Sequence, residues 1–154
     1  LVNMMRSNRT LETLHIHLTT LEGGEDSHAM IAAALGDNSS IKRFSLFATA
    51  GKLTNRAHKA FAKMLERNYA LEELEFQEED EDLSPKIDTF LKLNAIGRGR
   101  LLQEAFVGRE DWILRLGAVR DDLECLFHLL SLNPSLCQSE ERYQMGGRKR
   151  KRSN

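Results

Sequence analysis

A repeat of 30 residues, present without gaps, constrains this chain more than any other feature. The pattern N-x-x-Φ-x-x-Φ-x-Φ, in which Φ is an apolar residue, begins at Asn8, at Asn38 and at Asn68. An apolar residue also lies three positions before each asparagine: Met5, Leu35 and Leu65. A period of roughly 20–50 residues is typical of repeat architectures, in which each repeat forms one supersecondary unit and stacking buries a continuous core.

Each unit has the pattern of a short strand, a connection and a returning helix. A strand of five or six residues spans ~17–20 Å, and a helix of about twelve residues returns roughly the same distance. Strands stack about 4.8 Å apart, whereas helices need roughly 10 Å, so successive units must splay on the helical side and curve. The spacing therefore predicts an α/β solenoid, a horseshoe with short parallel strands on its concave face and helices on its convex face.

The repeat resembles the leucine-rich repeats of the ribonuclease-inhibitor-like type, in which L-x-x-L-x-L precedes a helix. The resemblance covers roughly residues 1–100, although here the asparagine precedes the first apolar position instead of following L-x-L. It implies protein–protein binding through the concave face and does not imply catalysis. Because Leu1–Ser7 has the pattern of the latter part of a repeat helix, we expect a partial chain with earlier repeats before it.

A fourth, altered unit ends the repeats. Ser84 and Pro85 are typical of a helix start, with serine as the N-cap and proline at the first helical position. Asn94 repeats the asparagine position, but Gly97 and Arg100 then stand where strand residues should be apolar. We therefore expect the strand series to stop there, with Gly97–Arg100 forming a turn whose arginines cap carbonyls of the preceding helix.

Residues 101–137 are predicted to form a C-terminal helical cap. Apolar residues recur at spacings of three and four through residues 110–132, which predicts one amphipathic helix that ends at Asn133–Pro134 and could kink or divide at Gly117. An open solenoid exposes an apolar end that needs a cover. The alternative is a helix that docks into a groove of a partner.

The candidate binding surface is the concave face of the predicted sheet. Successive side chains of a strand point to opposite faces, so with Leu14 and Ile16 directed inwards the intervening residues point outwards. The predicted partner-binding residues are Thr13, His15, His17, Arg43, Ser45, Phe47, Glu73, Glu75 and Gln77. Phe47 is the large apolar group among them, and an aromatic ringed by polar residues is typical of an interface anchor.

Catalytic, metal and cofactor sites are not predicted. His15 and His17 could present two imidazoles on one face, but no third zinc ligand accompanies them. The carboxylates at residues 78–82 do not match the spacing of a calcium loop and are interpreted as a solvated connection. Cys125 and His128 share a helix side but lack an orienting group and an oxyanion site.

A basic tail closes the chain. Residues 138–154 are predicted to be disordered, with an exposed cluster at Arg148, Lys149, Arg150, Lys151 and Arg152. Such clusters bind polyanions or the nuclear import machinery. Removing these five positive charges from the net charge of −1 leaves −6 on the rest of the chain, which disfavours strong binding of duplex nucleic acid.

The predicted location is intracellular, in the nucleus or the cytoplasm. Two cysteines are too few for a disulfide framework, which favours a reducing compartment. No secretory signal is recognisable, and no apolar run approaches the ~18–20 residues that a membrane-spanning helix needs.

Two functional hypotheses follow from the repeat. The first is a non-enzymatic scaffold or adaptor that binds another protein through the concave face. The alternative is the ligand-sensing or autoinhibitory C-terminal end of a larger regulatory receptor. Polyanion binding through the tail is a third hypothesis.

Overall fold

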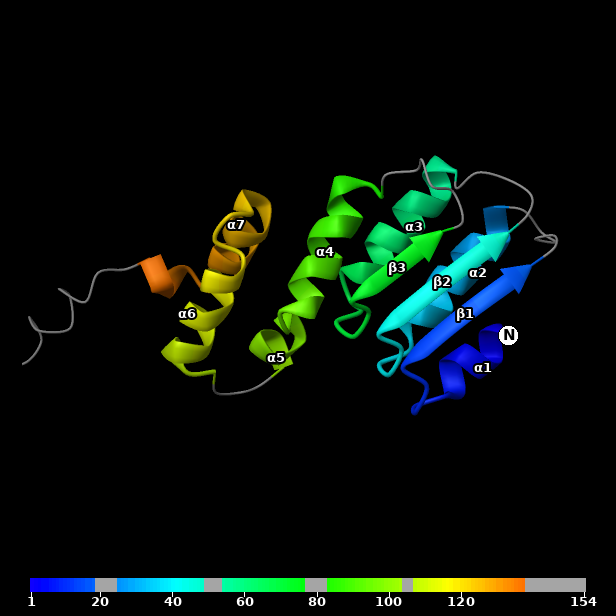
Figure 1. Ribbon diagram of the computed structural model, residues 1–154, viewed down its shortest axis with the longest axis horizontal. Helices are drawn as coiled ribbons and strands as arrows, with labels where there is room; N and C mark the ends of the chain where they lie inside the picture. The colour runs from blue at the N-terminus through cyan, green and yellow to red at the C-terminus, as the bar shows by residue number, and fades with distance from the viewer. Residues whose placement is uncertain (19–24, 49–53, 77–82, 104–106, 138–154) are drawn as a thin grey trace, which may run out of the picture.

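The fold is α/β, with a small parallel sheet and helices along one side of it (Figure 1). A computed structural model describes residues 1–18, 25–48, 54–76, 83–103 and 107–137. The three strands of the described chain are β1 (Thr13–Leu18), β2 (Arg43–Ala48) and β3 (Glu73–Phe76). The helices of these ranges are α1 (Val2–Ser7), α2 (Glu25–Gly36), α3 (Asn55–Leu65), α4 (Pro85–Ala95), α5 (Arg98–Gln103), α6 (Arg109–Ala118), α7 (Leu123–Leu132) and the short 3₁₀ helix η1 (Pro134–Cys137). None of them is both long enough and apolar enough to cross a membrane.

The strands pair with the 30-residue register that the repeat predicts. They are parallel and lie in the order β1-β2-β3. Thr13 of β1 pairs with Arg43 of β2, which in turn pairs with Glu73 of β3. Since a shift of one residue would turn every side chain to the other face, this register determines which residues reach the core.

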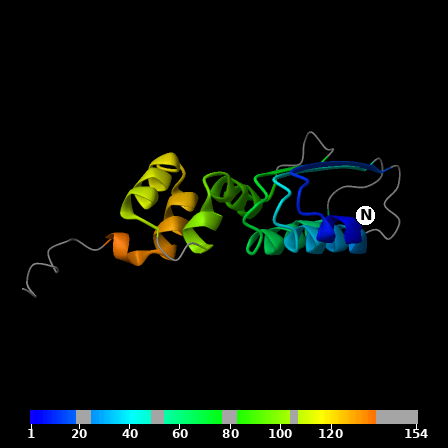
Figure 2. The same ribbon diagram turned by 90° about the horizontal axis from the view of Figure 1, so that it is seen from below.

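Strands and helices form two layers (Figure 2). One face of the sheet carries the apolar strand residues and packs on α2 and α3, whereas no helix of the described chain covers the other face. Phe44 and Leu74 occupy equivalent core positions, as do Ile16 and Leu46, and each is less than 9% exposed. The alternation of apolar and polar residues along each strand thus separates a core face from an open face.

The asparagine of each repeat ties neighbouring turns together. The side-chain amide of Asn68 donates to the main-chain oxygens of Leu35 (2.6 Å) and Asn38 (2.9 Å), one repeat earlier. Its side-chain oxygen accepts from the main-chain N–H groups of Ala70 and Leu71, both at 2.8 Å. Asn68 is 3% exposed, so these bonds satisfy polar groups that water reaches poorly.

The bonding of Asn68 recurs at Asn38, whereas Asn94 donates to a shifted pair of carbonyls and Arg98, 30 residues after Asn68, donates to the equivalent pair. Asn38 donates to the carbonyls of Met5 and Asn8, and Asn94 donates to those of Asn68 and Leu71. The asparagines therefore form a column that links neighbouring units of the structure. In the repeats at 8, 38 and 68, each lies three residues before the first apolar residue of the N-x-x-Φ-x-x-Φ-x-Φ pattern. This is not the position after L-x-L that the family resemblance leads one to expect.

The strand series stops in the fourth unit, as predicted, but the turn predicted over Gly97–Arg100 is wrong, because Arg98 and Arg100 lie in helix α5. Helix α4 begins at Pro85 with Ser84 as its N-cap. After Asn94 the chain turns at Gly97, whose φ is +83°, and enters α5 instead of a strand. Positive φ is readily adopted by glycine, which explains why this residue ends the unit.

The helix predicted over residues 110–132 is divided, as the glycine at position 117 allowed. The chain forms α6 and α7, and the break falls at residues 119–122, after Gly117. Asp122 causes the restart, because its carboxylate accepts the main-chain N–H of Cys125 at 3.0 Å and caps α7. The predicted apolar stripe is divided as a result, with Trp112 6% exposed and Leu123 78% exposed.

Candidate functional site

An aromatic pair dominates the helix-free face of the sheet. We call this surface the open sheet face and define it by Thr13, His15, His17, Arg43, Ser45, Phe47, Glu73 and Glu75. The rings of His17 and Phe47, paired across β1 and β2, are stacked with centroids 4.7 Å apart and planes 22° apart. His17 is exposed and Phe47 half-buried, so the pair offers an apolar surface held in place by the strands.

Hydrogen bonds orient the polar side chains beside this pair. The Ser45 hydroxyl donates to the Glu75 carboxylate at 2.9 Å, and the Arg43 guanidinium donates to the Thr13 hydroxyl at 3.2 Å. Ser45 was expected to be exposed, but it is 4% exposed and acts as a support for Glu75. Its larger neighbours cover the small side chain.

The open sheet face therefore combines a stacked aromatic pair with charges of both signs. His15, Arg43, Glu73 and Glu75 are exposed, as the strand alternation predicts. Gln77, which would extend the aromatic row, lies outside the described residues, as do the basic cluster at 148–152 and the acidic connection at 78–82. Rigid strands present these groups with little freedom to lose on binding.

Sequence reasoning missed the role of Arg98. Its side chain is buried, 1% exposed, and its guanidinium donates to the carbonyls of Leu65 (2.7 Å) and Asn68 (3.3 Å). It therefore caps the end of α3 and not, as expected, the preceding helix α4. At the end of α4 it is Arg115 that donates to the carbonyl of Ile96.

Aromatic rings flank the buried guanidinium. Its carbon lies 4.6 Å from the ring centroid of Phe90 and 4.9 Å from that of Tyr69. Burial lowers the pKa of Arg98 to about 10, and the phenol of Tyr69 opposes this shift. A Cβ on Gly99 would come within 2.8 Å of the Tyr69 side chain, so the glycine beside Arg98 was the available signal of a close approach.

The Cys125 thiol is in a poor environment for a nucleophile. Burial, with the Asp122 carboxylate close by, raises the pKa of Cys125 to about 11, whereas reactive cysteines have lowered values. His128 does not act on this thiol in the structure; its ring meets Phe90 edge-on at 5.5 Å between centroids. The two residues serve packing.

Only one of the two cysteines should react readily in the folded protein. With a thiol-reactive dye at pH 8, we expect exposed Cys137 to be labelled rapidly and buried Cys125 at least ~100-fold more slowly, because about 0.1% of a thiol with this pKa is ionised. Cys137→Ser should remove the fast phase, and denaturant should restore labelling of Cys125. Rapid labelling of both thiols in the folded protein would contradict the burial of Cys125.

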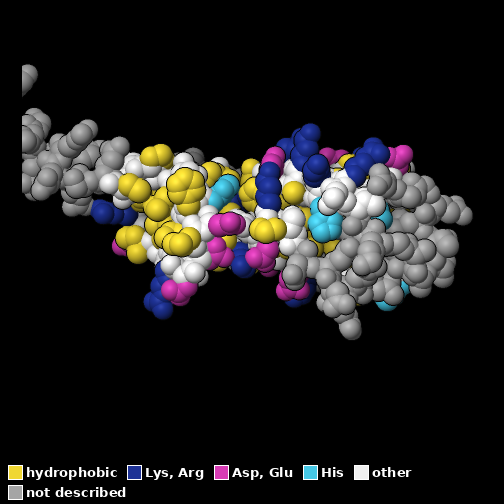
Figure 3. Space-filling model, turned by 90° about the horizontal axis from the view of Figure 1, so that it is seen from above, with side chains coloured by type: hydrophobic (Ala, Val, Ile, Leu, Met, Phe, Trp, Pro, Cys, Tyr) yellow, Lys and Arg dark blue, Asp and Glu magenta, His cyan; other side chains and the backbone are white. Residues whose placement is uncertain are grey.

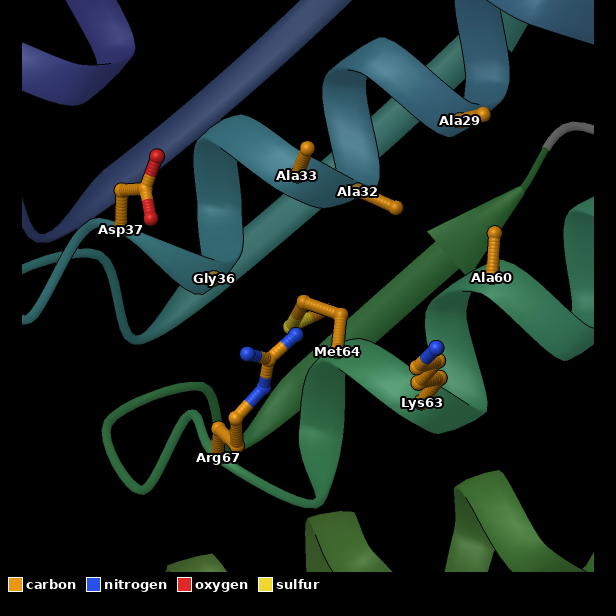
Figure 4. Close-up of a pocket in the computed structure, with 9 residues that line it drawn as sticks. All are labelled: Ala29, Ala32, Ala33, Gly36, Asp37, Ala60, Lys63, Met64 and Arg67. Atoms are coloured by element: carbon orange, nitrogen blue, oxygen red, sulfur yellow. The ribbon is translucent and has the colours of Figure 1, made fainter.

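A shallow pocket of about 340 Å³ lies between α2 and α3 (Figure 4). Small side chains form it, with Ala32 and Gly36 on α2 and Ala60 on α3, and Lys63 and Arg67 contribute positive charge. Small side chains at a contact between two helices leave a groove of this kind whether or not a ligand binds there. The open sheet face, with its aromatic pair and oriented carboxylate, is therefore the better candidate site.

A metal centre has no support in the described part of the chain. His15 and His17 share a face there, but no group of three or more histidine, cysteine or acidic side chains is placed to hold an ion.

Comparison with known proteins adds no assignment: no family model matches the chain, and neither a curated protein nor a solved structure is significantly similar to it.

Proposed function

We propose that this chain is a leucine-rich repeat module that binds another protein through the open sheet face. The observation that carries the proposal is the stacked pair of His17 and Phe47 on a sheet face that no described helix covers. Aromatic side chains surrounded by polar ones are enriched among the residues that dominate binding energy.

The repeat geometry supports a curved scaffold. Each unit adds one strand in register and one helix to the same side, and α2 and α3 pack on each other as β1 and β2 do. Helices need roughly twice the spacing of strands, so further units of this kind would bend the sheet into a horseshoe with the open sheet face inside. In this proposal α6 and α7 cap the last unit, since α7 contacts α4 and buries Cys125 and Leu129.

The mechanism of binding is preorganisation. Glu75 is held by Ser45, Arg43 by Thr13, and Phe47 by His17 before any partner arrives. Side chains that are already ordered lose less conformational entropy in the complex, which leaves more of the contact energy as affinity.

Replacing the anchor tests the proposal. The full chain is used to capture partners from cell extract, a captured protein is purified, and its dissociation constant is measured directly. For Phe47→Asp combined with Glu75→Lys we expect the affinity to fall at least ~30-fold, about 2 kcal/mol, while thermal unfolding stays cooperative. The pair reverses the charge at Glu75 and removes the apolar anchor.

A matched control is Met30→Asp, which places the same charge on an exposed apolar residue of α2, away from the open sheet face. This variant should bind the purified partner as the parent does. A folded double variant that retains full affinity would refute binding through the open sheet face.

A further inference from the structure

The groove between α2 and α3 has an apolar floor and a positively charged side. Lys63 on α3 and Arg67 just after it line the same hollow of about 340 Å³ as the small residues of the two helices. Both basic side chains are exposed, and Figure 4 shows them on the α3 side of the hollow. We call this surface the basic groove and define it by Ala32, Ala33, Gly36, Ala60, Lys63 and Arg67.

The basic groove continues past the ends of the two helices. A second hollow of about 340 Å³ is lined by residues of the two turns that follow α2 and α3, among them Ser39 and Tyr69. Gly36, Asp37 and Arg67 line both hollows, so the two adjoin and Arg67 borders each of them. An elongated surface of this kind suits a segment of polypeptide.

The cations of the basic groove have no acidic partner. No hydrogen bond or ion pair joins the side chain of Lys63 or Arg67 to another residue in the part of the chain that the structure describes. Asp37, which also lines the groove, pairs with Arg6 at 3.1 Å, and its main-chain oxygen accepts from Arg9 at 2.9 Å. These five residues comprise four positive charges and one negative charge, a net charge of +3.

The acidic side chains around the groove do not reduce this charge, because each pairs with another cation. These pairs are Glu66 with Lys86 (2.6 Å), Asp26 with Arg56 (3.3 Å) and Asp111 with Arg100 (3.9 Å). Each pair is neutral as a whole, so the net charge of +3 remains at the groove.

Lys59 extends the row of positive charge along α3. Lys59, Lys63 and Arg67 are four residues apart, which places them about 6 Å apart along one side of the helix and the turn after it. In Figure 3, dark blue lysine and arginine side chains project from the upper edge, the side on which the helices lie.

This row of cations opposes the stability of its own helix. Like charges four residues apart destabilise a helix. The negative end of the α3 dipole favours Lys63 in the last turn, but its effect does not reach Lys59 one turn earlier. A local arrangement that the fold does not reward is expected at functional sites, and here an anionic partner would offset the repulsion.

We propose that the basic groove binds an acidic amphipathic helix of another protein. The small residues of α2 and α3 let a third helix approach closely and place apolar side chains on the floor. Glutamates four residues apart on that helix repeat every ~6 Å, which matches the spacing of Lys59, Lys63 and Arg67, whereas a basic helix would meet like charge. The apolar floor and the short row of cations disfavour a nucleic acid, whose binding depends on many phosphate contacts.

Three synthetic helical peptides of 18 residues test the charge preference. The first has a leucine stripe, glutamate at every fourth position beside the stripe, and alanine elsewhere. The second has lysine in place of glutamate, and the third has the composition of the first with its glutamates spread around the helix. Binding of each dye-labelled peptide to the full chain is followed by fluorescence anisotropy.

We expect the first peptide to bind at least ~10-fold more tightly than the lysine peptide and more tightly than the peptide with spread glutamates. Raising the salt concentration should reduce both differences, because exposed charges are screened. Equal binding of the acidic and lysine peptides, or of the two glutamate peptides, would overturn the proposal. Preference for inorganic polyphosphate over the first peptide would also overturn it and would assign the groove to a polyanion.

Charge reversal in the groove locates the binding. Lys63→Glu combined with Arg67→Glu should weaken the first peptide ~10-fold or more and strengthen the lysine peptide. Both side chains are exposed, so circular dichroism should show an unchanged fold. The matched control is Arg109→Glu with Arg120→Glu, which reverses the same number of charges at exposed residues of the α6 and α7 end and should bind like the parent.

Filling the floor separates docking in the groove from attraction by charge alone. Ala33→Gln leaves the net charge unchanged and places a longer side chain at an exposed floor position of α2, so it should weaken the first peptide ~10-fold. Full affinity in this variant, or in the charge-reversed one, would refute docking in the basic groove. The Phe47→Asp, Glu75→Lys variant should bind the first peptide normally, because the basic groove lies on the helical side of the sheet and does not depend on the function proposed for the open sheet face.

Discussion

Asn68→Ala should destabilise the protein by about 3–5 kcal/mol, a large share of the stability of a domain of this size. The change removes four hydrogen bonds at a side chain that is 3% exposed. It leaves the carbonyls of Leu35 and Asn38 without these donors, and a buried polar group without a partner costs ~1–3 kcal/mol. Urea unfolding followed by circular dichroism measures the loss.

A second variant at the same position separates donors from acceptors. Asn68→Asp keeps the oxygen that accepts from Ala70 and Leu71 but replaces the amide donor with a charged oxygen facing two carbonyls. The folded state therefore raises the pKa of the new carboxyl, so this variant should regain stability as the pH falls toward about 4, where the group becomes protonated and can donate.

Asn55→Ala is the control for both, because Asn55 is exposed at the first residue of α3. It should change the free energy of unfolding by less than about 0.5 kcal/mol. If Asn68→Ala proves no more destabilising than this control, the asparagine column does not hold the repeats together.

Arg98→Met should also be strongly destabilising, by about 2–4 kcal/mol. Methionine fills most of the volume of the arginine stem, so the loss reports the missing hydrogen bonds to Leu65 and Asn68 and the missing contact with Phe90 and Tyr69. The control is Arg67→Met, at an exposed arginine, for which little change is expected. Denaturant unfolding of both variants gives the comparison.

The charge of Arg98 has a second, independent effect. Burial first and the nearby Arg98 charge second lower the pKa of His128. Arg98→Met should therefore raise the pKa of His128, which NMR titration of the imidazole can follow.

If Arg98→Met leaves the free energy of unfolding unchanged, the cost of burying the cation equals the stabilisation from its hydrogen bonds and aromatic contacts.

The strand register was predictable because it depends on sequence spacing alone. Residues 30 apart, such as Thr13, Arg43 and Glu73, had to become neighbours once each repeat formed one strand and one helix. Strand alternation then predicted which side chains reach the open sheet face. It did not predict that Ser45 is covered, because the exposure of a small side chain depends on the size of its cross-strand neighbours.

The helical end shows the limits of periodicity. Spacings of three and four continue from Trp112 to Leu130, so the pattern alone favours one helix. Asp122 interrupts it by capping a second helix, and the competition between a cap and the continuing helix depends on what each helix packs against. Leu123 and Phe127, which belong to the same apolar spacing as the core residues, are exposed for this reason.

The sequence by itself determined the repeat, the parallel register and the face that each strand residue occupies, because these follow from a period of 30 and an alternation of two. Only the tertiary structure decided where Arg98 lies, how the asparagines bond across repeats, and which apolar side chains of α6 and α7 are exposed. Each of these depends on contacts between residues that are distant in the chain, and the packing of whole helices determines such contacts.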